Sequence, residues 1–281
     1  PSEPQVYVRN GSCPELMLNY QITFGMHLVQ HYIMEDDMVR CRWRLDCSRP
    51  FLLGTKDYFR PDGLAAVVRT GPGEVFYDAG YSVLEHHQQQ AGYLVALQFA
   101  GVQSDRGGLV AVSNSGTQSF WFDPVAGELR LGLGASTVGG PAINPDTMTV
   151  DVDKGHISHF NTWDEELFYG TYQHEFCLFP FAGEWQEQPV AQRALGINTP
   201  VRTCELISIN TSPMPGELPM EASLMEVDAN SVYVQSAVWE DGHLALLLNE
   251  MQGKPITCRL KAAGEEVVVR LQSGELKHVL I

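Results

Sequence analysis

The chain has 281 residues, of which 44% are hydrophobic and 19% are charged, a composition typical of a globular protein rather than a disordered or fibrous one. Its 34 acidic residues outnumber its 18 basic residues, and the formal net charge is −16. This charge argues against binding to nucleic acid or to an anionic membrane surface, because both require a surplus of Lys and Arg on one face. No apolar stretch approaches the roughly 18 residues of a membrane-spanning helix.

The six cysteines are scattered along the chain and form no Cys-x-x-Cys pair. In a chain of this length, such a distribution predicts reduced thiols rather than a disulfide framework. The first residues, Pro1-Ser2-Glu3-Pro4, carry neither a signal-peptide pattern nor an initiator Met, so we expect a processed or trimmed chain. Reduced thiols favour a cytoplasmic location.

The first clear element is a strand over Val39–Asp46, where apolar and charged residues alternate without interruption. Side chains of a strand alternate between its faces, so the arginines of this segment share one face and the apolar residues share the other. The pattern predicts that Trp43 is a core residue. Further along, the apolar run over Leu94–Ala100 favours a strand that is buried on both faces.

Helical periodicity is almost absent from the sequence. The best candidate, Pro189–Leu195, spans about two turns and begins with Pro at a tolerated first position. Next along the chain, Ser212–Pro219 contains three prolines and a glycine. This punctuation predicts a boundary between a large β-domain, residues 1–212, and a small C-terminal β-subdomain, residues 220–281, that packs on it.

Short strands continue to the end of the chain. Asp241-Gly242 lies between the segments Val232–Glu240 and His243–Glu250, a strong signal for a β-hairpin. Ile256–Lys261 then repeats the alternation of apolar and polar residues. Many short strands separated by Gly and Pro turns predict an all-β fold of the sandwich class.

No residue pattern predicts a catalytic centre. Glycosidases use two carboxyl groups at a defined separation, whereas the adjacent acids of Asp36-Asp37 and Glu165-Glu166 would point to opposite faces of a strand. We interpret both pairs as turn and surface acids. The sequence also lacks a nucleophile elbow, a phosphate-binding loop and a dinucleotide fingerprint. We therefore expect no catalytic residue in this chain.

One cluster has the chemistry of metal ligands, and it consists of Asp151, Asp153, His156 and His159. Carboxylates with two imidazoles can hold zinc or manganese. A polar turn that enters the next strand is the commoner structure for such a pattern, so we expect no metal in this chain.

Aromatic residues crowd the stretch from residue 163 to residue 185. Most such rings fill a sandwich core, but an exposed ring can stack on a sugar. Trp163 is followed by three acids, which favours a wet groove. His174 and Glu175 are costly to bury unpaired, and Trp185 follows a turn, so these four residues are the predicted carbohydrate-binding candidates. The alternative is that His174 and Glu175 only hydrogen-bond neighbouring strands.

Six short segments between residues 74 and 200 carry a resemblance through their sequence and their order. They are Glu74–Asp78, Val83–His86, Gly108–Gly116, Gly127–Leu133, His174–Trp185 and Asn198–Pro200. Together they resemble the carboxy-terminal region of glycoside hydrolase family 38, the α-mannosidases. Phe181 stands where that family usually has His, and Ser113–Ser115 replaces its Leu-Asn-Asp, which indicates a divergent branch.

The resemblance implies a large galactose-mutarotase-like β-super-sandwich with the small β-subdomain behind it. It also implies that the zinc ligands and the nucleophilic aspartate lie in an amino-terminal β/α barrel, whose zinc motif begins His-x-His-x-Asp. This sequence contains no His-x-His. We therefore expect zinc in a missing N-terminal catalytic domain and no cofactor in this chain.

These observations predict a non-catalytic C-terminal domain of an α-mannosidase-like glycoside hydrolase. Its expected partners are the missing catalytic domain, which it supports, and a carbohydrate, whose cleft it helps to line. Two alternatives stay open. A free-standing carbohydrate-binding module needs an exposed aromatic platform, and a mutarotase-like enzyme needs a His and a carboxylate that converge in the sandwich cleft.

Overall fold

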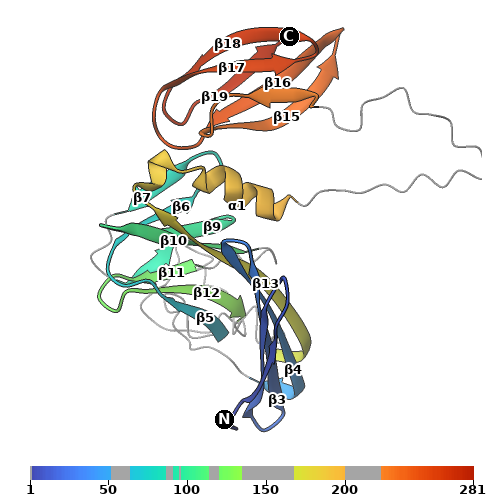
Figure 1. Cartoon of the computed structure of the whole chain (residues 1–281), viewed down its shortest axis with the longest axis vertical. Coiled ribbons are helices and arrows are strands. Elements are labelled where there is room, and N and C mark those ends of the chain that lie inside the picture. The colour runs from blue at the N-terminus through green and yellow to red at the C-terminus, as the bar shows by residue number, and fades with distance from the viewer. Residues whose placement is uncertain are drawn as a thin grey trace, which may run out of the picture. The chain divides into compact units, whose positions relative to one another are not determined.

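The computed structural model of the protein describes residues 2–51, 64–86, 91–94, 96–113, 120–134, 168–199 and 223–281 (Figure 1). The chain divides into two compact units. The first is Pro1–Ala79 with Leu84–Glu187, and the second is Gly80–Val83 with Gln188–Ile281. The boundary predicted at Ser212–Pro219 lies outside the described residues.

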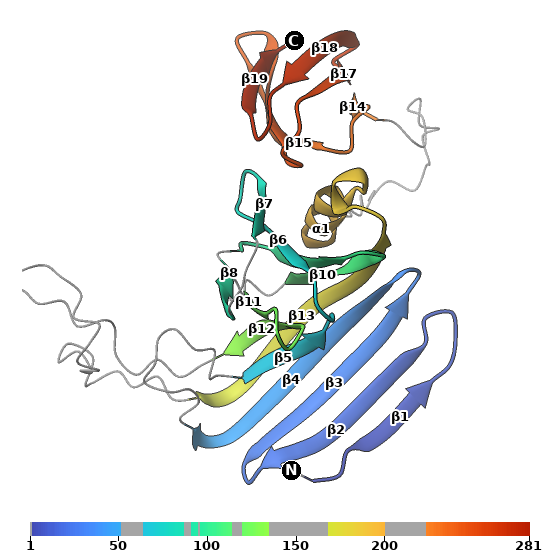
Figure 2. The same ribbon diagram turned by 90° about the vertical axis from the view of Figure 1, so that its left-hand side faces the viewer.

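The first unit is built around a nine-stranded sheet (Figure 2). In spatial order, its strands are β1 (Gln5–Arg9), β2 (Glu15–Thr23), β3 (Met26–Glu35), β4 (Met38–Phe51), β13 (Phe168–Ala182), β10 (Gly107–Ser113), β9 (Phe99–Ser104), β6 (Glu74–Asp78) and β7 (Val83–His86). From β1 to β6, each strand pairs antiparallel with its neighbour.

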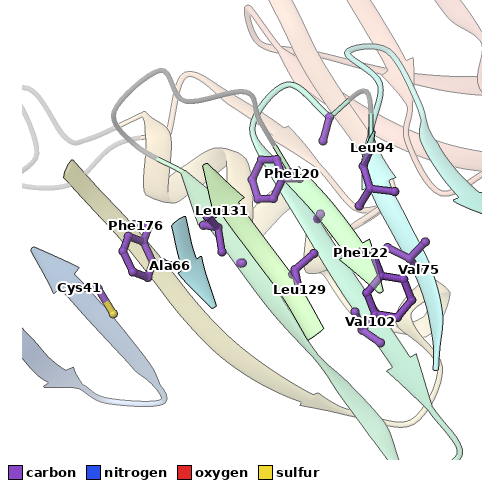
Figure 3. Close-up of a cluster of buried hydrophobic side chains, with 13 residues drawn as sticks. Cys41, Ala66, Val75, Leu94, Val102, Phe120, Phe122, Leu129, Leu131 and Phe176 are labelled. Atoms are coloured by element: carbon purple, nitrogen blue, oxygen red, sulfur yellow. The ribbon is translucent and has the colours of Figure 1, made fainter. Parts of the chain in front are cut away.

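A four-stranded sheet forms the second layer of this unit, in the order β5 (Leu64–Arg69), β12 (Glu128–Gly134), β11 (Phe120–Asp123), β8 (Gly92–Leu94). Figure 3 shows side chains of both layers meeting in one hydrophobic cluster. Phe120, Phe122 and Leu129 come from the smaller sheet, while Val102 and Phe176 come from the larger sheet. Two sheets that bury one face each against the other form a β-sandwich. The predicted all-β sandwich is confirmed.

Strand β4 matches the alternation that predicted it. Cys41 and Leu45 are buried, whereas Arg42 and Arg44 are exposed. Trp43 shares the buried side of β4 but is itself only partly buried. Its ring makes edge contacts with Tyr32 and Phe176, at centroid separations of 6.3 and 5.4 Å.

The single strand predicted over Leu94–Ala100 is wrong. Strand β8 ends at Leu94, the chain bends at Leu97 and Gln98, and β9 begins at Phe99 in the other sheet. Leu94 and Phe99 are both buried, because the chain crosses from one layer of the sandwich to the other at this point. A crossing segment is apolar for the same reason as a doubly buried strand, so composition did not distinguish the two.

The second unit contains two three-stranded sheets. One has the order β14 (Met225–Val227), β17 (Ile256–Ala262), β18 (Glu265–Leu271), and the other has β15 (Val232–Glu240), β16 (His243–Glu250), β19 (Leu276–Leu280). Leu246, Leu260 and Leu271 are completely buried in their shared core. The predicted hairpin is confirmed: Asp241 and Gly242, with φ of 49° and 82°, join β15 to β16.

The predicted helix is also present, as α1 (Val190–Asn198) in the second unit. It differs from the predicted Pro189–Leu195 at both ends. Pro189 is the N-cap residue and not the first helical residue, and the helix continues to Asn198. A single-turn 3-10 helix, η2 (Trp185–Glu187), precedes it in the first unit.

Candidate functional site

The candidate site is the part of β13 that carries His174 and Glu175, together with the strands beside it. Strand β4 pairs with β13 so that His174 lies opposite Trp43 and Glu175 lies opposite Arg42. Directly paired residues project to the same side of a sheet. His174 therefore projects to the side that carries the core, and Glu175 projects to the side that carries the arginines.

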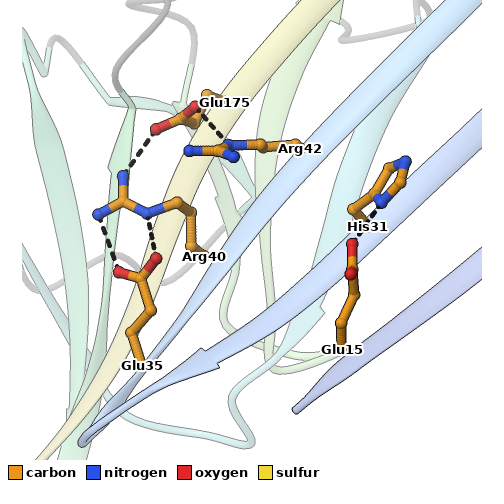
Figure 4. Close-up of polar contacts among 6 residues, drawn as sticks. All are labelled: Glu15, His31, Glu35, Arg40, Arg42 and Glu175. Atoms are coloured by element: carbon orange, nitrogen blue, oxygen red, sulfur yellow. Dashed lines mark hydrogen bonds and ion pairs between the residues drawn. The ribbon is translucent and has the colours of Figure 1, made fainter. Parts of the chain in front are cut away.

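Glu175 is held by two arginines of β4 (Figure 4). Arg40 Nη1 donates to Glu175 Oε1 at 2.6 Å, and Arg42 Nε donates to Oε2 at 3.0 Å. Arg40 also binds both carboxylate oxygens of Glu35, at 2.8 and 3.0 Å. Burial opposes the ionisation of Glu175, but the hydrogen bonds from Arg40 and Arg42 outweigh it, and its pKa lies below the ordinary value.

The same face carries further hydrogen-bonded pairs between neighbouring strands. His31 Nδ1 lies 2.6 Å from Glu15 Oε1, as Figure 4 shows, and this hydrogen bond lowers the pKa of Glu15. Thr171 Oγ1 donates to Asp46 Oδ1 at 2.6 Å and lowers the pKa of that carboxyl group. On this face, hydrogen bonds and ion pairs therefore join adjacent strands.

His174 lies among apolar side chains on the other face. Neither of its ring nitrogens has a hydrogen-bond partner in the part of the chain that the structure describes, and both are buried. Burial lowers the pKa of His174 and favours the neutral ring. Because His174 and Glu175 project to opposite faces, they do not form the converging acid–base pair that a mutarotase-like enzyme requires.

Trp185 fills a structural position. Its side chain is 3% exposed and stacks on Phe76, with ring centroids 4.9 Å apart and planes inclined by 10°. Its indole Nε1 donates to Glu85 Oε1 at 2.7 Å, and its backbone N–H donates to Gln103 Oε1 at 2.8 Å. Gln186 Nε2 donates to the same Glu85 oxygen. This geometry gives the ring a packing role in the first unit.

Trp163 lies outside the described residues, as does the Asp151–His159 cluster. Another aromatic side chain, which sequence reasoning missed, is exposed instead. Trp239, near the end of β15, is 65% exposed. The adjacent Asp241-Gly242 turn was a signal for it, because side chains beside a hairpin turn often lie beyond the core.

Cys41, Cys177 and Glu250 also carry groups with catalytic chemistry, and all three are buried. Burial raises the pKa of Cys41 to about 12 and that of Cys177 to about 11, so both thiols are protonated at neutral pH. Glu250 is completely buried, and its carboxylate accepts hydrogen bonds from backbone N–H groups of two adjoining turns. These donors are Gln252, Gly253 and Gly274, at 2.8 to 2.9 Å.

Within the described residues, no three His, Cys, Asp or Glu side chains lie close enough together to share a metal ion. None of the helices in these same residues has the length and apolar character needed to cross a membrane.

No family model matches the sequence, and no curated protein matches it. Solved structures that share its fold include two from Enterococcus faecalis. One is a protein in glycosyl hydrolase family 38 from Enterococcus faecalis, with a TM-score of 0.68, and the other is an alpha-mannosidase from Enterococcus faecalis V583, with a TM-score of 0.70. Each is 10% identical to this chain and covers 98% of it.

The chain covers 36% of the first structure and 34% of the second. At 10% identity the similarity establishes the fold, and it confirms at that level the resemblance seen in the sequence. The chain thus has the fold of about a third of a glycosyl hydrolase family 38 protein.

Proposed function

We propose that the chain is a non-catalytic C-terminal β-domain of an α-mannosidase-like glycoside hydrolase and that it supports the domain that performs the reaction. The observation that supports this most is the coverage. Nearly the whole chain, 98%, matches a part that makes up only 34–36% of two glycosidase-family structures. We therefore infer that the chain functions as one part of such a protein.

The candidate site favours this role. A glycosidase needs one carboxyl group that stays protonated and a second one at a defined distance. Glu175 is instead kept ionised by Arg40 and Arg42, and those bonds join β13 to β4. The arrangement holds two long strands in register and provides no proton donor.

The finer parts of the proposal concern zinc, sugar and location. Zinc and the reacting carboxylates are assigned to the missing amino-terminal domain. Sugar contact through His174, Glu175, Trp185 or Trp163 stays a prediction, as does a cytoplasmic location. Among the three of these residues that the structure describes, Glu175 alone projects to the arginine-bearing face.

The proposal is tested by assaying the purified 281-residue chain with an aryl α-mannoside, with and without added zinc. We expect no turnover above the buffer blank, whereas a longer protein that also contains the catalytic domain hydrolyses the same substrate. Zinc-dependent turnover by the chain alone would contradict the proposal.

A further inference from the structure

The two layers of the first unit differ in width. The larger sheet has nine strands and the smaller has four, and the cluster between them draws on strands β4, β13, β10, β9 and β6 of the larger sheet. None of the described buried residues of this cluster lies on β1 or β2. Tyr32 of β3 is partly buried and packs against the cluster. Figure 2 shows β1, β2 and β3 extending beyond β5, the edge strand of the smaller sheet.

Part of the core side of β2 and β3 is buried in a second cluster that contains Met26 and Leu28, and the rest of this side carries exposed apolar side chains. Val8 pairs with Leu16, which pairs with Tyr32, so all three project to the same side of the sheet as the core. Val6 projects to that side as well, two residues before Val8, and Met34 does so two residues after Tyr32. We call Val6, Val8, Leu16 and Met34 the overhang patch.

Each residue of the overhang patch is exposed to solvent. Their exposed fractions are 56% for Val6, 67% for Val8, 37% for Leu16 and 47% for Met34. Scattered apolar residues on a surface are ordinary, but adjacent ones on the core side of a sheet mark a surface that another element covers. The opposite face of β2 and β3 carries the Glu15–His31 pair. The alternation of apolar and polar residues, which specifies one buried face and one solvent-exposed face, therefore continues toward this edge of the sheet.

The chemistry of the patch identifies the kind of partner. All four side chains are aliphatic and uncharged, which suits apolar protein side chains and offers nothing to a phosphate or to the hydroxyl groups of a sugar. Four such side chains also fall short of the roughly 600–800 Å² per partner that a stable complex of two free chains requires. A domain joined to this chain covalently needs no such area, because linkage gives it a high effective concentration.

We propose that the overhang patch is the surface on which the remaining, catalytic part of the glycosidase docks. This inference rests on the proposed function and adds to it the face that receives the partner. The fraction of the solved structures left unmatched, about two thirds of each chain, supplies a partner of sufficient size.

A matched pair of substitutions tests the proposal. Val8→Asp places a charge in the patch, and Val268→Asp places one on β18, in the second unit. The two valines are 67% and 70% exposed and both lie on edge strands, so the pair differs chiefly in the patch. Leu16→Asp serves as a second variant within the patch. Each variant is made in the isolated chain and in the longer protein that contains the catalytic part.

In the isolated chain, all three variants should melt within about 2 °C of the wild type, because exposed positions tolerate substitution. In the longer protein, Val8→Asp and Leu16→Asp should lower the melting temperature of this domain by several degrees, about 4 °C or more, while Val268→Asp should not. If Val8→Asp and the wild type have the same melting temperature in the longer protein, the proposal is overturned.

A second outcome would also overturn it. If the isolated wild-type chain sediments as a dimer and Val8→Asp makes it monomeric, the patch binds a second copy instead. Failure of the proposed function looks different. In that case the longer protein hydrolyses no α-mannoside, yet Val8→Asp and Val268→Asp still differ in their effect on its melting.

Discussion

Trp43 lies where two hydrophobic clusters meet. It packs against the cluster between the two sheets and also against a smaller cluster formed by Met26, Leu28, Leu45 and Cys47. Its edge contacts with Tyr32 and Phe176 join strands β3, β4 and β13 through their side chains. One partly buried ring thus connects three adjacent strands of the large sheet.

Trp43→Ala should therefore lower the free energy of unfolding by about 3 kcal/mol, since it leaves a cavity beside both clusters. Trp239→Ala is the matched control, because that ring is 65% exposed, and it should cost less than about 0.5 kcal/mol. Urea unfolding of both variants measures the difference. A similar decrease in the free energy of unfolding for both variants would show that Trp43 does not pack between the two clusters.

His174 should make stability depend on pH. Its folded-state pKa lies below the ordinary value near 6.5, so the unfolded chain binds the proton more tightly. The contribution of the neutral ring is complete above pH 6.5 and is lost as the pH falls below that value. The wild type should lose more stability between pH 7.5 and pH 5.5 than His174→Gln does.

Urea midpoints at the two pH values measure this effect, and His243→Gln, the same change at an exposed histidine, is the control. An equal loss in the wild type and in His174→Gln would show that another group is responsible for the pH dependence.

The sequence indicated part of the candidate site and missed the rest. The cost of burying His174 and Glu175 unpaired predicted a special environment, and Glu175 is indeed paired with Arg40 and Arg42, more than 130 residues away. Trp185 could not be placed from its local turn, because its burial depends on Phe76 and Glu85, which approach it only in the folded chain.

At the scale of elements, local patterns succeeded where neighbouring residues decide the structure. The alternation in β4 and the Asp241-Gly242 turn were both predicted, because side-chain direction and turn geometry are set within a few residues. The crossing between β8 and β9 was missed, and so was the pairing of β4 with β13, since both depend on partners distant in the sequence.

Two glycines of the second unit offer a test of these local structures. Gly242 has a φ of 82°, which an L-residue adopts only at a cost, and a Cβ at this position meets no atom within 4 Å. Gly242→Ala should therefore destabilise the unit by about 1 kcal/mol through the backbone alone.

Gly196 lies in α1, and a Cβ there also meets no atom within 4 Å. Gly196→Ala should stabilise the unit by about 0.5 kcal/mol, because Ala favours the helix. The two substitutions make the same chemical change and should have opposite signs in chemical denaturation. Shifts of the same sign would mean that the hairpin turn or the helix is not formed as described.

At the scale of the whole molecule, the fold is shared with a third of two glycosidase-family chains at 10% identity. So low an identity preserves a β-sandwich because many apolar residues satisfy the same alternation. Function depends on particular side chains, and two of the candidates here are engaged elsewhere: Glu175 in an ion pair with Arg40, and Trp185 in stacking on Phe76. These two facts are the basis of the proposal that the chain supports another domain.

Deletion of this chain from the longer protein tests this central claim most directly. The kcat/KM for an aryl α-mannoside and the melting temperature are measured for the longer protein and for its catalytic part without this chain. We expect kcat/KM to fall at least tenfold without the chain, a change of about 1.4 kcal/mol in transition-state stabilisation, and the melting temperature to fall as well. Full activity and unchanged thermal stability without the chain would contradict this claim.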